Sequence, residues 1–226
     1  MYFAVIGDIV SSKSLKERTK IQKKLENCLM MLNEKYEDVM IKKLSITLGD
    51  EFQALFSDGK YLLEIIHRIE LEIYPVKLRF GIGIGNIEFD YGNLDSPYQS
   101  DGSVWWNARR AIEKVEAKKS KNKIEYISNI YIISNDEVFN NRINIILDMC
   151  YSIKSTWKEK QIELISYTIG KYGFKGDFIY KDVASYFGQS ISTIYGKYKA
   201  SKYSNYVNVM NVITMEIISE GEKAWV

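Results

Sequence analysis

The fold is decided by residues 44–56, which read LSITLGDEFQALF. Apolar and polar residues alternate over 44–48 and again over 51–56, and this is the period of a half-buried β-strand. Gly49 and Asp50, which separate the two runs, are residues typical of tight turns. The stretch therefore predicts a β-hairpin whose tip carries the carboxylate of Asp50.

The patterns around this hairpin follow the order strand, helix, hairpin, helix, strand, helix, strand. That order fits a split βαβ unit with antiparallel strands, so we expect an α+β fold with a ferredoxin-like, palm-type domain. The strands and helices that surround the hairpin are expected at 2–6 (strand), 16–36 (helix), from about 57 (helix), 77–85 (strand), 103–117 (helix) and 126–133 (strand).

From about residue 135 onward the pattern becomes almost continuously helical. Within this part, residues 181–198 fit a helix-turn-helix template. Ala184 is small where two helices would cross, Gly188 suits a left-handed turn residue, and Ile194 is placed to pack the second helix onto the first. We therefore predict a palm domain over residues 1–150 and an all-α helix-turn-helix domain over 151–226.

Composition limits the possible partners. The chain has 226 residues with 31 Lys plus Arg against 29 Asp plus Glu, so bulk charge indicates no partner, and 46% hydrophobic residues exclude a disordered chain. Its two cysteines, Cys28 and Cys150, are too far apart for a metal ribbon. No run approaches about 20 uncharged apolar residues, so we expect no membrane partner and a cytoplasmic location.

Two carboxylates are candidates for a metal site. Asp8 ends the first predicted strand, and Asp50 lies at the tip of the hairpin. Because these strands are neighbours in a ferredoxin-like sheet, the two side chains are expected to meet at one edge. Carboxylate oxygens suit Mg²⁺ or Mn²⁺, which also bind phosphates. The backbone N–H groups of residues 9–13, with two hydroxyls and one lysine, could cradle a polyphosphate.

Four blocks of sequence carry a resemblance to a known family. They are GDIVSS at 7–12, TLGDEFQALF at 47–56, RFGIGIG at 79–85 and DGSVWWNARR at 101–110. These blocks look like the four core motifs of class III nucleotidyl cyclases. Together with the C-terminal helices, the chain most closely resembles the SatD family of bacterial proteins, and the resemblance covers essentially all of it.

The resemblance implies a role for each matching residue. Asp8 and Asp50 would bind the metal, with the backbone carbonyl of Ile9 as a further ligand. An arginine on the fourth block, Arg109 or Arg110 depending on the register, would stabilise charge on the phosphate. The nucleotide would be contacted by Ile9, Val10, Ser11, Ser12 and Lys13.

The sequence also departs from the cyclase pattern. Ile46 stands where cyclases of this class typically carry a base-recognising lysine, and Trp105 or Trp106 replaces the asparagine of the fourth block. We therefore expect the metal and phosphate half of the site to be retained and the base-reading half to be lost.

The second helix of the helix-turn-helix segment is expected to expose hydroxyls and lysines that can reach phosphates and base edges in DNA. The candidate DNA-binding residues are Ser190, Ser192, Thr193, Lys197 and Lys199. The alternative is a module for protein contact or dimerisation. The only histidine, His67, is expected to be a partly exposed helix residue.

Three functions are therefore open. The first is a SatD-family protein whose palm binds a nucleoside triphosphate or related phosphorylated ligand and regulates the DNA-binding module. The resemblance links such a protein to acid tolerance and secretion, which suggests a stress role. The second is a transcriptional regulator whose palm only senses or dimerises. The third is an active cyclase or nucleotidyltransferase, and each active version predicts a homodimer.

Overall fold

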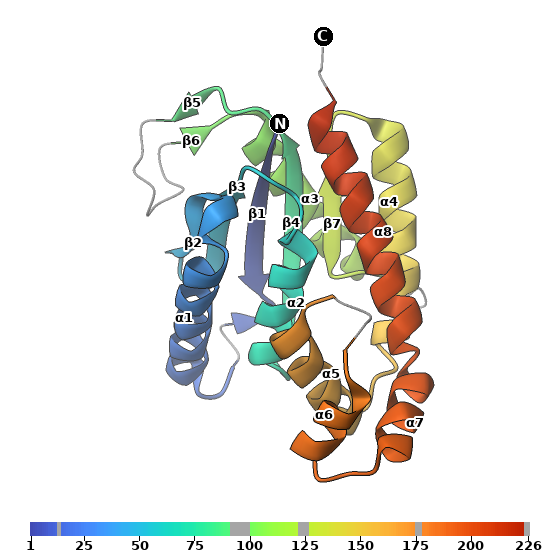
Figure 1. Cartoon of the computed structure of the whole chain (residues 1–226). Coiled ribbons are helices and arrows are strands. Elements are labelled where there is room, and N and C mark those ends of the chain that lie inside the picture. Colours follow the sequence, from blue (N-terminus) through green and yellow to red (C-terminus); the bar gives the residue numbers. More distant parts are fainter. Residues whose placement is uncertain (13–14, 91–99, 122–126, 175–177, 224–226) are drawn as a thin grey trace.

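The protein is described by a computed structural model, which covers the chain except residues 13–14, 91–99, 122–126, 175–177 and 224–226 and the side chains of 48 and 118–121. Its centre is a five-stranded sheet with strand order β2-β3-β1-β4-β7 (Figure 1). The elements in chain order are β1 (Tyr2–Ile9), α1 (Arg18–Lys35), the 3-10 helix η2 (Glu37–Val39), β2 (Met40–Leu48), β3 (Glu51–Phe56), α2 (Leu62–Glu72), β4 (Leu78–Gly85), β5 (Phe89–Asp90), β6 (Ser100–Asp101), α3 (Ser103–Lys121), β7 (Ile130–Ile133), α4 (Glu137–Lys154), α5 (Glu159–Tyr172), α6 (Tyr180–Tyr186), α7 (Ile191–Ser201) and α8 (Tyr203–Glu222).

The sheet confirms the predicted α+β class. β1 lies between β3 and β4 and is antiparallel to both, β2 is antiparallel to β3, and β7 adds a parallel strand beside β4. The order β2-β3-β1-β4 is that of the expected split βαβ unit. The predicted hairpin is also present, since β2 ends at Leu48, β3 begins at Glu51 and Gly49 adopts the left-handed conformation at φ 65°.

Alternation along β1 sends its side chains to two different cores. Phe3, Val5 and Ile9 join the larger hydrophobic cluster, which includes side chains of α1, α2, α4 and α8. Ala4 and Ile6 point to the opposite face and pack with α3. The sheet is therefore a middle layer, with α3 alone on one side (Figure 1). Asp8 continues the alternation of Ala4 and Ile6, which puts its carboxylate on the α3 face.

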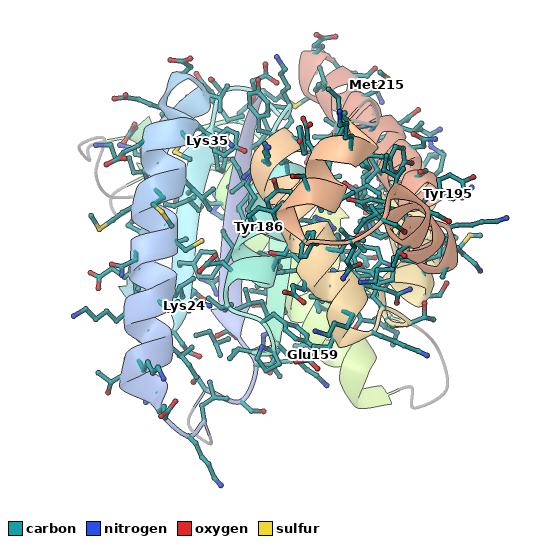
Figure 2. All side chains as sticks on the ribbon, turned by 60° about the horizontal axis from the view of Figure 1, so that its bottom comes forward. Lys24, Lys35, Glu159, Tyr186, Tyr195 and Met215 are labelled. Atoms are coloured by element: carbon teal, nitrogen blue, oxygen red, sulfur yellow. The ribbon has the colours of Figure 1, made fainter. Side chains whose placement is uncertain are left out.

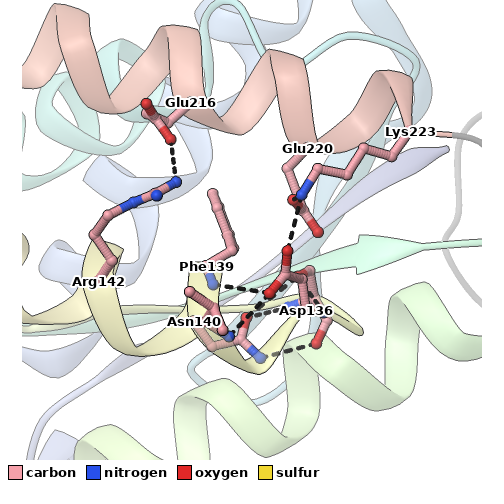
Figure 3. Close-up of polar contacts among 9 residues, drawn as sticks. Asp136, Phe139, Asn140, Arg142, Glu216, Glu220 and Lys223 are labelled. Carbon is pink, nitrogen blue, oxygen red and sulfur yellow. Dashed lines mark hydrogen bonds and ion pairs between the residues drawn. The ribbon is translucent and has the colours of Figure 1, made fainter.

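The last helix returns to the palm. α8 lies beside α4, and the start of β1 and the end of α8 are at the same end of the molecule (Figure 1). Figure 3 shows two ion pairs that hold α8 there, Arg142 to Glu216 at 2.5 Å and Lys223 to Asp136 at 2.9 Å. Asp136 also caps α4, because its carboxylate accepts hydrogen bonds from the first-turn N–H groups of Val138 and Phe139.

The predicted pair of helices at 181–198 is present as α6 and α7. Gly188 in the intervening turn has φ 60°, and no atom lies within 4 Å of the β-carbon that another residue would add there. Gly188 is therefore required by the backbone conformation alone. Val183, Ala184 and Ile194 are buried between the helices, as their spacing predicts. Seen with the end that carries α6 and α7 brought forward, α1 with Lys24 lies on one side, and the C-terminal helices with Tyr186 and Tyr195 lie beyond it (Figure 2).

The predicted domain boundary after residue 150 falls within α4, and residues from both sides of it belong to one hydrophobic cluster. The division into two domains stays a prediction. One expectation about the palm is wrong: His67 is only 1% exposed, because α2 packs against α5 and α8 on the side that carries it. None of the helices within the described ranges is both long and apolar enough to span a membrane.

Candidate functional site

Glycines place α3 directly against the sheet. A β-carbon at Gly81 would lie 2.3 Å from the carbonyl oxygen of Ala108, and one at Gly83 would lie 2.1 Å from that of Val104. Both distances are far below van der Waals contact, so only glycine allows this approach. The third block of the sequence thus has a packing role, which is to position the helix that carries Arg109.

Three neighbouring strands bring charged side chains together on the α3 face. Asp8 of β1 is in register with Glu51 of β3 on one side and with Arg79 of β4 on the other. The Arg79 guanidinium donates hydrogen bonds to Asp8 Oδ2 from Nε at 2.7 Å and from Nη2 at 2.5 Å. Its Nη1 lies 3.0 Å from a carboxylate oxygen of Glu116 on α3. Arg79 therefore links the end of β1 to α3.

The structure brings the two predicted metal ligands within interaction range, because the carboxyl groups of Asp8 and Asp50 each shift the pKa of the other. Burial and the Asp50 carboxylate raise the pKa of Asp8 to about 6, even though Arg79 acts in the opposite direction. Burial also opposes ionisation of Asp50, but hydrogen bonds from Ser12 and Asp8 hold its pKa below the usual value. Below about pH 6 the proton of the pair therefore resides on Asp8, while Asp50 is ionised.

Of the two candidate arginines, Arg109 faces the site. Its Nη1 and Nη2 atoms donate to the two carboxylate oxygens of Glu51 at 2.6 and 2.9 Å, which is a bidentate pair. Gln53 donates to the same carboxylate at 2.7 Å. Arg110 is exposed and forms no hydrogen bond or ion pair with another described residue. The contacts of the two arginines thus differ: Arg109 is bonded to a residue of the site, and Arg110 is not.

The turn after β1 has the shape expected of a polar loop at the site. Ser11 is exposed and adopts a left-handed conformation at φ 57°, which is uncommon for a residue with a side chain. Ser12 is buried and bonds to Asp50. Val10 is half-buried and its N–H donates to the Lys77 carbonyl at 2.9 Å. Ile9 buries its side chain in the larger core, which leaves its backbone carbonyl as the predicted ligand. Lys13 lies outside the described residues.

The residues that replace the base-reading positions have structural contacts of their own. Ile46 packs against the larger core. Trp105 is buried against the sheet with its indole N–H on Ser100, and the half-exposed Trp106 donates to Asp101. Asn107 is 3% exposed and donates to the carbonyl of Ile84, which ties α3 to β4. These contacts agree with the loss of the base-reading half.

A divalent cation fits the donors that the structure provides, with limits. Asp8 and Asp50 are adjacent oxygen donors, and Mg²⁺ commonly uses one or two carboxylates and completes its shell with water and phosphate. Within the described ranges, no three or more His, Cys, Asp or Glu side chains are grouped so that they could hold a metal ion. Such a site would therefore depend on these two carboxylates together with a backbone carbonyl, water and phosphate oxygens. A bound cation would supply positive charge to hold and polarise phosphate oxygens.

Sequence reasoning missed Arg79, Glu51 and Gln53. A signal was present: in a split βαβ sheet β4 borders β1, and Arg79 opens the third block as a lone cation in an apolar strand. Glu51 follows Asp50 directly and has the alternation of a residue on the α3 face. Its partner could not be predicted, because the pair depends on how closely α3 approaches the sheet.

The proposed DNA-binding residues lie on or beside α7, and three of them, Ser190, Thr193 and Lys197, already have local partners. Ser190 caps the helix by accepting from the Thr193 N–H at 3.1 Å. Lys197 donates to Gln189 at 2.8 Å. Ser192, Thr193 and Lys199 are exposed.

Comparisons with known proteins give a family and several distant structural likenesses. A bacterial light-regulated adenylyl cyclase is 16% identical, with a TM-score of 0.37 over 58% of this chain and 74% of that one. The guanylyl cyclase Cya2 is 16% identical, with a TM-score of 0.30 over 50% and 68% of the two chains. A regulator of polyketide synthase expression from Bifidobacterium adolescentis is 12% identical, with a TM-score of 0.27 over 98% and 81%. Scores this low assign no function.

A search of curated proteins found no match. The model of the SatD family, in contrast, matches residues 2–217, which is nearly the whole chain and includes both the Asp8–Asp50 pair and the C-terminal helices. The protein is therefore a member of the SatD family.

Proposed function

We propose that the protein binds a nucleoside triphosphate or a related phosphorylated ligand through Mg²⁺ or Mn²⁺ at Asp8 and Asp50. The observation that carries this proposal is the contact between the two carboxyl groups at one edge of the sheet. Two carboxylates in contact repel each other when both are ionised, and a divalent cation relieves that repulsion. Burial, and after it the Asp50 carboxyl group, raises the pKa of Asp8 to about 6, so the folded site disfavours a second negative charge there.

The phosphates would lie against the turn that follows β1. Ser11 and Ser12 supply hydroxyl and backbone N–H donors beside Asp50, and the expected lysine of this loop is Lys13. Arg109 would exchange the Glu51 carboxylate for phosphate oxygens, because a guanidinium binds both groups with the same bidentate geometry. Its guanidinium is within reach of solvent, since the side chain is 44% exposed.

The nucleotide is proposed to act as a regulatory ligand of a cytoplasmic protein in a stress response. Ile46 and the tryptophans at 105 and 106 support binding over purine cyclisation, because Ile46 has no polar group and the indole N–H groups already donate to Ser100 and Asp101. An active nucleotidyl cyclase or nucleotidyltransferase is the alternative. Analysis of the products formed from each triphosphate in the presence of Mn²⁺ separates the two.

The test is calorimetric titration of the protein with each nucleoside triphosphate, with and without Mg²⁺. We expect binding that requires the cation and that is lost in Asp8→Ala and in Asp50→Ala. The matched control is Asp38→Ala, which removes an exposed carboxylate without a described partner. Binding that is unchanged by the first two substitutions would refute the proposal.

A second function, DNA binding by α7, is favoured by the exposure of Ser192, Thr193 and Lys199 on one helix. We expect affinity for a duplex to fall with salt, and the double variant Lys197→Ala/Lys199→Ala to reduce the salt slope by about 1.8. Lys60→Ala on the palm is the control. Binding without salt dependence would argue for a protein-contact module. A single copy would bind DNA weakly, so DNA binding predicts a homodimer. An active nucleotidyl cyclase or nucleotidyltransferase predicts one as well. Analytical ultracentrifugation would detect the dimer.

A further inference from the structure

A cleft of about 440 Å³ opens between the palm and the C-terminal helices, on the sheet face opposite Asp8. One wall comes from α2 and the segment before β4, with Leu71 and Val76, and the other from the end of α4 and the start of α5, with Trp157 and Ile162. The volume is in the range of small-molecule sites, roughly 300–1,000 Å³. Apolar side chains contribute to both walls, Glu70 and Lys154 lie on the floor, and the exposed Lys77 also lines the cleft.

The floor is a connected set of polar groups from three segments that are distant in sequence. Lys154 donates to both carboxylate oxygens of Glu70 at 2.9 Å and to Asn129 Oδ1 at 3.1 Å. Asn129 Nδ2 donates to Glu70 Oε1 at 2.5 Å and to the Leu78 carbonyl at 3.1 Å. Lys154 and Glu70 each retain 16% exposure of their side chains, so the set is within reach of a ligand.

His67 completes the floor and has no donor left for a ligand. One ring nitrogen lies 2.7 Å from the Leu63 carbonyl and therefore donates, and the other accepts from the Tyr206 hydroxyl. Burial and the nearby Lys154 lower the pKa of His67 to about 4, so the ring is neutral under ordinary conditions. The indole N–H of Trp157 is likewise bonded to the Ser201 carbonyl.

The hydrogen bonds already formed by Lys154, Asn129 and Glu70 limit what the floor can still bind. All three ammonium hydrogens of Lys154 and both amide hydrogens of Asn129 have partners. Each carboxylate or amide oxygen can accept two hydrogen bonds, and Glu70 Oε2 and Asn129 Oδ1 each receive one from a described residue. The floor can therefore accept further hydrogen bonds, but Lys154 and Asn129 have no hydrogen left to donate.

We propose that this cleft binds a small, ring-sized organic molecule that donates N–H hydrogen bonds to Glu70 and Asn129. An amidine, a primary amide or an amino-substituted heterocycle has this chemistry, and the ring would lie between the walls at Val76 and Ile162. A carboxylate or phosphate is disfavoured at the floor, because the hydrogens of Lys154 and Asn129 already have partners and the free acceptor positions of Glu70 and Asn129 would repel it. Leu78 in this cleft precedes Arg79, the partner of Asp8, so the two sites share the start of β4.

The proposal is tested on the full chain with three probes of equal size: benzamidine, benzamide and benzoate. Binding is followed by chemical-shift changes in protein NMR spectra. We expect benzamidine and benzamide to bind at least tenfold more tightly than benzoate, because only they present N–H donors. Equal or tighter binding of benzoate would overturn the donor assignment.

Location is tested with variants that fill the cleft. Ile162→Trp and Val76→Trp place a large ring at half-buried wall positions, and each should abolish benzamidine binding. The matched control is Ile145→Trp on α4, where the side chain is 62% exposed and does not line the cleft. Circular dichroism establishes that each variant is folded. Benzamidine binding that survives in a folded wall variant would place the ligand elsewhere, and Asp8→Ala should leave this binding unchanged.

Discussion

Asp8→Asn is expected to stabilise the protein in the absence of divalent cations. Asparagine resembles the form of Asp8 that is protonated below about pH 6, since its oxygen can accept from Arg79 and its amide can donate to Asp50. The substitution thus removes a charge that the folded state disfavours. Residues that serve a binding site at the expense of stability commonly show this behaviour.

The magnitude follows from the pKa of Asp8, which rises from 3.8 to about 6 on folding. Between these two pH values the folded protein binds more protons than the unfolded chain, so its stability falls as pH rises through the window. At about 1.36 kcal/mol per pH unit, the loss reaches at most about 3 kcal/mol above pH 6. Because the proton is shared with Asp50, we expect Asp8→Asn to gain about 1 to 3 kcal/mol at pH 8 and almost nothing below pH 4.

The assay is urea unfolding of wild type and variant at pH 8 and at the lowest pH where both fold, in the presence of a chelator. Asp38→Asn, at an exposed position, is the control and should change the free energy of unfolding little at either pH. An Asp8→Asn protein that is no more stable than wild type at pH 8 would refute the reasoning. A gain that is independent of pH would equally contradict it.

Further predictions concern α3 and its arginines. Gly83→Ala should destabilise by about 1–3 kcal/mol in urea unfolding, because its β-carbon would meet the Val104 carbonyl, whereas Gly170→Ala in α5 meets no atom within 4 Å and should stabilise by about 0.5–1 kcal/mol. Equal effects would show that α3 does not approach β4 closely. Arg109→Ala should weaken nucleotide binding about tenfold or more in calorimetry, since a charged hydrogen bond contributes about 1.5–3 kcal/mol. Arg110→Ala should change it less than about twofold, and the reverse order would exchange their roles.

Much of the fold could be predicted because its patterns are local. The alternation over 44–56 and the turn at Gly49 identify the hairpin, and Gly188 identifies the turn between α6 and α7. The same logic predicted that Asp8 and Asp50 meet, since Asp8 lies near the end of β1 and Asp50 lies just before β3, the strand beside β1. In each case the spacing of residue types along the chain is sufficient.

What could not be predicted depends on contacts between distant segments. The Arg109–Glu51 pair requires α3 to lie against β4 at the distance that Gly81 and Gly83 permit. His67 was expected to be partly exposed because its helical neighbours include a charged residue, but α8 brings Tyr206 onto its ring. The packing of a C-terminal helix onto the palm leaves no local signal in the sequence of α2.

The most direct test of the central claim is a titration of the protein with ATP and with GTP, in the presence of Mg²⁺ and again in a chelator, for wild type and Asp50→Ala. We expect saturable binding of at least one triphosphate that requires Mg²⁺ and is weakened at least about tenfold by the substitution. Binding of equal affinity in the chelator, or in Asp50→Ala, would contradict a cation-dependent nucleotide site at the Asp8–Asp50 pair.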